Sequence, residues 1–220
     1  QRVRDALERI GGLDVPLTGI VGSEKTERYR NKVIFNVGEQ NGRAVTGFYR
    51  ARSHDIVATE SCLIQAEVSD RAAAALRRWM DRCHVPAYDE TTGRGLIRHL
   101  FIRHVFGTGQ TLVTVVATSR DLPRLRQLID EIRKNCPEVT GIVINENTAR
   151  GNTVLAGEFY TVWGEGQVED TLCSLRFSLS PRSFYQINSA QAQRLYEKAL
   201  EYAGLSGRET VLDLYCGTGT

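Results

Sequence analysis

Two predicted β-hairpins, each followed by a helix, constrain the fold of this chain more than any other feature of its sequence. Residues 29–50 carry β-branched and aromatic residues on both sides of an Asn-Gly pair, which favours a two-residue hairpin turn. A helical stretch follows, with Ser69 or Asp70 as its expected N-cap. A second hairpin, a second helix and a strand come next, at residues 96–118, 122–136 and 139–147. We therefore expect an antiparallel α+β domain over residues 14–182.

The pattern changes near residue 183. A capped amphipathic helix is predicted from Ser189, and its apolar side is made of Ala192, Leu195, Ala199 and Leu200. The stretch TVLDLY after it is almost continuously apolar, which is typical of a strand buried in a parallel sheet. We expect residues 183–220 to begin a second, α/β domain. Residues 1–13 have a helical pattern that ends at two glycines, and we expect them to be the end of a preceding helix.

A glycine turn follows the predicted apolar strand, in the sequence VLDLYCGTGT. Such a turn lets the backbone approach a ligand closely. The third glycine of the dinucleotide-binding pattern is absent, so a pyrophosphate is not the obvious ligand. Asp213 lies just before the turn, and an acidic residue there suits S-adenosylmethionine (SAM), which carries an ammonium group, a ribose and no phosphate. A turn that binds no ligand is the alternative interpretation.

The aromatic residues of SFYQIN, just ahead of the last helix, also have two interpretations. Phe184 and Tyr185 could present a flat surface to a planar ligand, or they could pack at a domain junction.

Composition narrows the function less than the motifs do. The formal net charge of +2 is too small to argue for nucleic-acid binding on its own. The five cysteines are odd in number and form no CxxC pair, so we expect reduced thiols and a cytoplasmic protein. No apolar run approaches the roughly 18–20 residues that a membrane helix needs, so we expect no membrane partner. The chain starts with Gln inside a helical pattern, and we expect it to be a fragment of a longer protein.

The segments SPRSFYQINSAQAQRLYEKALEYAGL and VLDLYCGTGT closely resemble the RNA (uracil-5-)-methyltransferases, which make 5-methyluridine in ribosomal and transfer RNA. The F-x-Q-[VI]-N and D-L-[YF]-C-G-x-G patterns are together highly specific to that family. The stretches YRNKVIFNVG, GFYRARSHDIV, CLIQ and GLIRHLFIR resemble it too, so the resemblance covers nearly the whole chain. It is strongest to the bacterial enzymes that act on 23S ribosomal RNA (rRNA).

The resemblance implies a Rossmann-like SAM-dependent catalytic domain that begins in residues 183–220. In this family a Cys thiolate attacks carbon 6 of a flipped uracil, carbon 5 takes the methyl group of SAM, and a base then removes the proton from carbon 5 as the Cys leaves. Phe184 corresponds to the residue that stacks on the base, whereas the nucleophile and the base lie in later motifs. The residues expected to bind or shape the site for SAM are Gln186, Asp213, Tyr215, Gly217, Gly219 and Thr220. We therefore expect an inactive fragment that lacks the N-terminal RNA-binding barrel and most of the catalytic domain.

The resemblance also implies an RNA-binding central domain and, in many members, a [4Fe–4S] cluster. Cys62 matches the fourth cluster ligand, but the other three ligands are absent. Basic residues on strand faces are expected to contact phosphate, although each could equally be a solvated surface side chain. They are Arg30, Lys32, Arg50, Arg98 and Arg103.

The leading interpretation is SAM-dependent methylation of carbon 5 of a uridine, with 23S rRNA as the substrate and the protein as a monomer. Methylation of transfer RNA (tRNA) is one alternative. A non-catalytic RNA-binding module, formed by the central domain alone, is an alternative of a different class.

Overall fold

The computed structural model describes residues 1–151 and 153–220. The helices are α1 (Arg2–Asp5), a π-helix η1 (Ala6–Ile10), α2 (Glu67–Cys83), α3 (Leu125–Asn135) and α4 (Ser189–Ala203). The strands are β1 (Lys32–Gln40), β2 (Arg43–Tyr49), β3 (Ile56–Ala58), β4 (Ile97–His104), β5 (Thr111–Ala117), β6 (Val139–Glu146), β7 (Glu158–Gly164), β8 (Val168–Leu172) and β9 (Leu175–Leu179).

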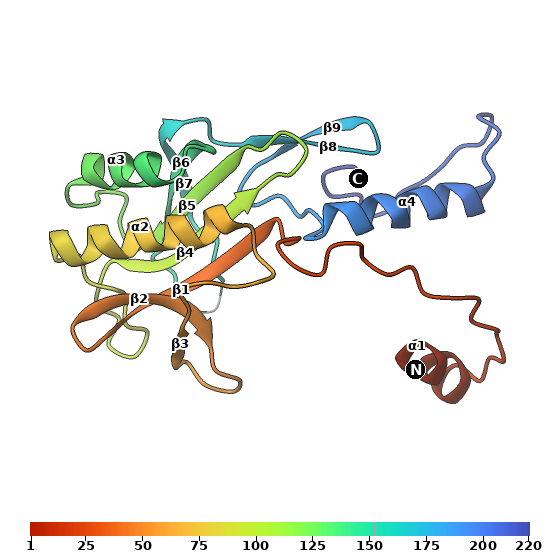
Figure 1. Ribbon diagram of the computed structural model, residues 1–220, viewed down its shortest axis with the longest axis horizontal. Coiled ribbons are helices and arrows are strands. Elements are labelled where there is room, and N and C mark those ends of the chain that lie inside the picture. The colour runs from red at the N-terminus through yellow and green to blue at the C-terminus, as the bar shows by residue number, and fades with distance from the viewer. Residues whose placement is uncertain (152) are drawn as a thin grey trace.

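Seven strands form one sheet in the order β3-β2-β1-β4-β5-β6-β7 (Figure 1). Every neighbouring pair is antiparallel except β5 and β6, which run parallel and are joined through α3. A parallel pair needs a crossover connection, and the helix supplies it. The sheet confirms the expected α+β class with a largely antiparallel sheet, and the single parallel pair is a feature the sequence did not predict.

The predicted hairpin turn between β1 and β2 is confirmed. Asn41 and Gly42 have φ angles of 53° and 73°, so both central residues adopt the positive φ of a type I′ turn. The N-cap predicted for α2 was wrong. The helix begins at Glu67 with Ala66 at its N-cap, and Ser69 and Asp70 lie inside it. Asp70 forms an ion pair with Arg28, so its side chain serves a tertiary contact rather than a cap.

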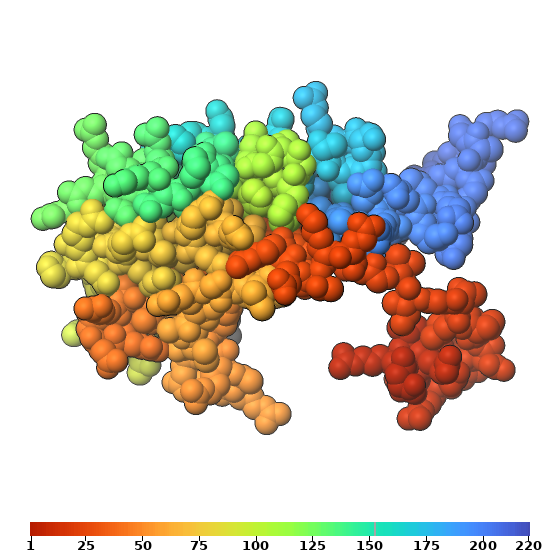
Figure 2. All heavy atoms as spheres, viewed as in Figure 1, coloured from red at the N-terminus to blue at the C-terminus, as the bar shows by residue number. Residues whose placement is uncertain are grey.

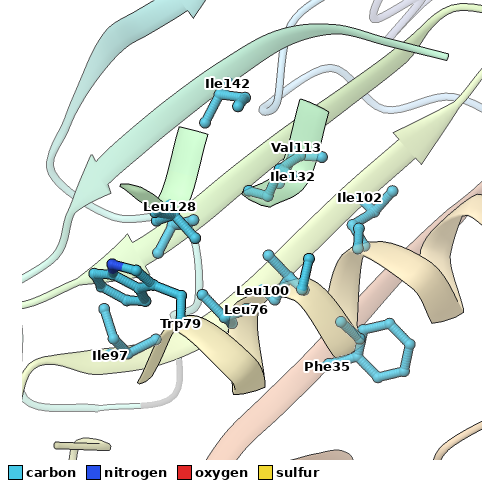
Figure 3. Close-up of a cluster of buried hydrophobic side chains, with 14 of the residues drawn as sticks. Phe35, Leu76, Trp79, Ile97, Leu100, Ile102, Val113, Leu128, Ile132 and Ile142 are labelled. Carbon is cyan, nitrogen blue, oxygen red and sulfur yellow. The ribbon is translucent and has the colours of Figure 1, made fainter. Parts of the chain in front are cut away.

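The main core lies between one face of the sheet and helices α2 and α3 (Figures 1 and 3). Leu76 and Trp79 of α2 point into it, and Leu128 and Ile132 of α3 lie beside them. Each of these side chains is at most 1% exposed. The alternating burial of β1, with Phe35 on the core side, matches the period-two pattern of its sequence.

A smaller core covers the opposite face of the sheet, over strands β4, β5 and β6. The hairpin of β8 and β9 contributes Val168, Leu172 and Leu179 to this core, and the following loop contributes Tyr185. Val143 of β6 is among the sheet residues beneath them. Because one cluster joins the hairpin and Tyr185 to the sheet, the segment before α4 is packed against the sheet.

The stretch TVLDLY does not form the strand that its sequence predicts. Residues 205–220 contain no helix or strand, and Val211, Leu212 and Leu214 are each at least 65% exposed. A strand of this kind needs neighbours on both sides to pair its backbone, and the part of the chain that the structure describes offers none. The apolar side of α4 is likewise only partly covered, since Leu195 remains 61% exposed.

The first ten residues lie apart from the main body of the molecule, as Figure 2 shows in red. None of the residues of α1 and η1 is buried. Where the domains divide stays a prediction, with boundaries at residues 13/14 and 182/183. Across the residues described, no helix has both the length and the apolar character to cross a membrane.

Candidate functional site

The loop of residues 180–188, between β9 and α4, carries the two aromatics of the SFYQIN motif, and they differ in burial. Tyr185 is 1% exposed and belongs to the smaller core, whereas Phe184 is 65% exposed. Packing at the junction therefore explains Tyr185 and leaves Phe184 free to contact a ligand. Asn188 ends the loop as the N-cap of α4, and its Oδ1 accepts a hydrogen bond from the backbone N–H of Gln191 at 3.1 Å.

The loop is held against the sheet by two buried polar residues. Arg103, at the end of β4, donates from Nη2 to the carbonyl oxygen of Ser183 at 2.6 Å. Asn31, just before β1, donates from Nδ2 to the carbonyl oxygen of Gln186 at 2.8 Å. These two side chains are 0% and 1% exposed. The irregular backbone of the loop thus finds partners in the sheet, as buried backbone carbonyls require.

A buried polar cluster lies beneath the loop. Asp170 of β8 accepts hydrogen bonds at Oδ1 from the backbone N–H groups of Gly107 and Thr171, at 3.0 and 2.9 Å. Burial, together with the charge of Asp170, raises the pKa of Tyr185. Burial lowers the pKa of Arg103 to about 10, so its guanidinium is still charged at neutral pH. The cluster therefore holds a neutral phenol beside a cation, and the cation donates to the loop backbone.

The residues after α4 approach the same loop. Thr218 donates from Oγ1 to the carbonyl oxygen of Phe184 at 3.3 Å. The hydroxyls of Tyr196 on α4 and Thr220 lie 3.3 Å apart. The glycine turn is folded back on itself by a hydrogen bond of 2.9 Å from the N–H of Gly219 to the carbonyl oxygen of Cys216. This turn and the loop of residues 180–188 therefore lie next to each other, as a shared binding site requires.

A groove of about 640 Å³ lies between α4, the β8–β9 hairpin and the last residues. Asp213, Gly219 and Thr220 line it, together with mostly apolar side chains. Gln186 and Tyr215 do not line it, and Tyr215 is fully exposed. Gly217 has a φ of 60°, which favours glycine at that position. The structure thus brings together three of the six residues expected at a SAM site, and the role of all six stays a prediction.

Cys62 is partly buried in the loop before α2. Its backbone N–H lies 3.4 Å from Oδ2 of Asp70, and its carbonyl oxygen accepts a hydrogen bond from Arg28 at 2.8 Å. A [4Fe–4S] cluster needs four ligands, usually thiolates, and no group of three or more His, Cys, Asp or Glu side chains is placed to hold a metal within residues 1–151 and 153–220. The described residues do not fit such a cluster by themselves, and the role of Cys62 stays a prediction.

The five basic residues expected to contact RNA fall into two groups. Arg30 and Lys32 are half-buried, and Arg50 is exposed. They lie at one end of the sheet, because β1 begins where the antiparallel β2 ends. Burial, followed by the charges of Arg103 and Arg30, lowers the pKa of Lys32. Among the described residues, none of these three side chains forms an ion pair, so an anion could neutralise them.

Arg98 and Arg103 are in the interior instead. Arg98 is 4% exposed and donates to the carbonyl oxygens of Asn147 and Ala149 at 2.9 and 2.8 Å. Arg103 is fully buried beneath the loop. The expectation that these two would contact phosphate does not hold in this conformation, because their guanidiniums are used to bind backbone carbonyls. Alternation along a strand indicates a face, but it does not show which loops cover that face.

Asn31 is the site residue that the sequence analysis missed. Its partners lie more than 150 positions further along the chain, and no local pattern connects the two segments. The only signal was a polar residue between two basic ones at the start of a predicted strand, in YRNKVIF.

The whole chain is similar in sequence to proteins named as RNA methyltransferases. It is 40% identical over 220 residues to an uncharacterized RNA methyltransferase of Clostridium tetani, covering 100% of the chain and 48% of that protein. It is 39% identical over 220 residues to one of Caldanaerobacter subterraneus, covering 49% of that protein. The chain thus spans about half the length of the curated relatives it matches. No model of a known protein family matches it.

A solved structure shares the fold. The chain superposes with a TM-score of 0.73 on the Pyrococcus abyssi tRNA (uracil-54, C5)-methyltransferase in complex with S-adenosyl-L-homocysteine. The match covers 90% of this chain and 46% of that one, at 23% sequence identity. The chain therefore shares its fold with part of that protein.

Proposed function

We propose that this chain, as a relative of RNA methyltransferases over its full length, is part of an enzyme that uses SAM to methylate carbon 5 of a uridine in RNA. The observation that carries the proposal is the 40% identity along the whole chain to a protein named as an RNA methyltransferase. The fold shared with a tRNA uracil-C5 methyltransferase supports uracil as the target base. The exposed Phe184 beside the glycine turn supports this location for the site.

In this proposal Phe184 stacks on a uracil that has left the RNA helix. A target base in a folded RNA must leave its stack before an enzyme can reach carbon 5, and an aromatic side chain stabilises the exposed face. The side chain is free to do this because Tyr185, rather than Phe184, fills the core. SAM supplies the methyl group, and Gln186 with the residues of the glycine turn form part of its pocket. We place the nucleophile in a later motif, as the resemblance implies, and not among the cysteines of this chain. Cys216 lies in the glycine turn itself.

The basic residues at the end of the sheet would hold the RNA backbone. Arg30, Lys32 and Arg50 lie on the end of the sheet against which the loop of Phe184 packs, because β4 ends there at Arg103 and His104. Contacts to phosphate position an RNA without reading its sequence. This arrangement favours a substrate that spans the sheet end and the loop, with 23S rRNA as the proposed RNA from the resemblance of the motifs.

Transfer RNA is the second candidate substrate. The observation that favours it is the solved structure, since that protein is a tRNA (uracil-54, C5)-methyltransferase. A non-catalytic RNA-binding role is the remaining alternative. It is favoured by the seven-stranded sheet and the basic residues at its end.

The test is methyl transfer by the longer protein that contains this chain. We would incubate it with SAM labelled in the methyl group and with either 23S rRNA or unmodified tRNA, and follow radioactivity in the RNA. The proposal expects label in one RNA class and little in the other, and identifies the substrate by that difference. RNA that binds in a filter assay but gains no label, with either RNA, would support the binding module instead.

A further inference from the structure

Asn31 connects the start of β1 to the loop that carries Phe184 and Gln186. Its backbone N–H donates to the carbonyl oxygen of Ile187 at 2.9 Å, and its Nδ2 donates to that of Gln186 at 2.8 Å. The same Nδ2 is 2.9 Å from Oγ of Ser189 in the first turn of α4. The carbonyl oxygen of Asn31 accepts from the N–H of His104, so the residue is itself fixed to β4.

The amide of Asn31 has one orientation that satisfies its surroundings. The carbonyl oxygen of Gln186 only accepts hydrogen bonds, so the Asn31 atom facing it must be the nitrogen. The opposite orientation would bring two oxygens together within 3 Å. The Oδ1 atom is buried without a hydrogen-bond partner among the described residues. The side-chain hydrogen bonds of Asn31 among the described residues thus all run from its donor end toward the loop and α4.

Four carbonyl oxygens of the loop are held from outside it. Those of Gln186 and Ile187 are held by Asn31, that of Ser183 by Arg103, and that of Phe184 by Thr218. With these carbonyls fixed, the backbone has little freedom to turn, and the directions of the side chains between them are set. Of the three donors, Asn31 holds the two carbonyls closest to the Gln186 side chain, and it is therefore placed to control that side chain most directly.

We infer that Asn31 is a positioning residue, which holds the backbone of Gln186 and Ile187 so that Gln186 faces SAM while Phe184 faces the base. The inference rests on the proposed function for the identity of the ligand. The two hydrogen bonds from Asn31 to the carbonyls of Gln186 and Ile187, called the clamp below, do not depend on that function. Arg30 and Lys32 lie on either side of Asn31 in the sequence, so the residue also joins the proposed RNA-binding end of the sheet to the proposed SAM loop. Asn31 touches neither substrate, and acts through Gln186.

The first experiment tests the clamp without any ligand. Asn31→Asp keeps the size of the side chain but replaces both N–H donors by an oxygen that repels the carbonyl of Gln186. Amide hydrogen exchange of residues 183–189 should become about 5- to 10-fold faster, which is the change in local opening expected for one lost hydrogen bond. Asn36→Asp, within β1 itself, is the matched control, since the Asn36 side chain contacts His99. Equal exchange of residues 183–189 in wild type and both variants would overturn the inference.

If Asn31→Asp fails to fold by circular dichroism, Asn31→Ser takes its place. Serine adds no charge, and its side chain is too short to bring a donor to where Nδ2 of Asn31 meets the carbonyl of Gln186. The substitution therefore removes that hydrogen bond. The same acceleration of exchange is expected in residues 183–189, and its absence counts against the clamp in the same way.

The second experiment uses methyl transfer by the longer protein that contains this chain. If Asn31 positions Gln186, Asn31→Asp should raise the KM for SAM about tenfold, with a smaller change in kcat. The loss of one hydrogen bond, worth about 1.4 kcal/mol, accounts for a change of that size. The KM for RNA and its dependence on salt should stay unchanged. A fall in kcat alone, or equal changes in both KM values, would show that Asn31 only stabilises the fold. If wild type transfers no methyl group, the proposed function fails, and the exchange experiment still decides the clamp.

Discussion

Phe184 is the residue whose two possible roles the structure separates most clearly. Its side chain is 65% exposed, so its removal should change the free energy of unfolding by no more than about 0.5 kcal/mol. If it stacks on the target base, Phe184→Ala should weaken the productive RNA complex by roughly 1–3 kcal/mol, or about 5- to 150-fold in kcat/KM. Phe184→Trp should keep most of the activity, because it restores an aromatic face. Unchanged kcat/KM in Phe184→Ala, with stability also unchanged, would remove Phe184 from the site.

His99 gives a prediction about pH. Burial, and next the charge of Arg98, lowers the pKa of His99 from 6.5 to about 4. Between these two pH values the unfolded chain binds more protons at this position than the folded chain does. The free energy of unfolding should therefore fall as the pH is lowered from 6.5 to 4, by up to about 3 kcal/mol from this group. Above about pH 7.5 the imidazole is neutral in both states and contributes no slope.

The measurement is urea unfolding at several pH values in wild type and in His99→Gln. The variant lacks the imidazole and should lose less stability than wild type between pH 6.5 and about 4. The carboxylates that titrate in this range are the same in both proteins. Parallel curves for the two proteins would mean that His99 is protonated as easily in the folded chain as in the unfolded one.

At the scale of elements, α2 should carry much of the stability of the sheet. Leu76 is fully buried between α2 and β4, and its truncation leaves a cavity (Figure 3). Leu76→Ala should lower the free energy of unfolding by about 3 kcal/mol. Glu67→Ala, at the exposed start of the same helix, should change it by less than about 0.5 kcal/mol. Thermal or urea unfolding checks both, and a similar small loss in both variants would contradict the packing described for α2.

The elements also show which patterns in the sequence predict structure and which do not. The β1–β2 hairpin was predictable because the Asn-Gly turn and the alternation are local. The start of α2 was not, because Asp70 is recruited by Arg28 from another segment. The strand expected in TVLDLY depends on neighbouring strands, so its local pattern alone does not form it. Tyr185 and Phe184 could not be assigned from the sequence, because adjacent aromatics look alike until one of them is buried.

For the whole molecule, the distribution of charge predicts how RNA binding should depend on salt. Lys32→Ala and Arg50→Ala should each reduce the slope of log K against log salt by roughly 0.7, the value for one phosphate contact on a single strand. Arg98→Ala is the informative comparison, since Arg98 is buried among backbone carbonyls. It should lower the free energy of unfolding and leave the slope unchanged. A reduced slope in Arg98→Ala, or an unchanged slope in Lys32→Ala and Arg50→Ala, would mean that the RNA binds elsewhere than at this end of the sheet.

The central claim is that the loop of residues 180–188 belongs to a site that methylates carbon 5 of uridine. The most direct measurement is release of tritium from RNA labelled at carbon 5 of its uridines, with the longer protein that contains this chain and unlabelled SAM. Substitution at carbon 5 must expel the hydrogen there, so we predict SAM-dependent release in wild type and a strong reduction in Phe184→Ala. Methylation of the RNA without any release of tritium would contradict the claim, because the methyl group would then be on another atom.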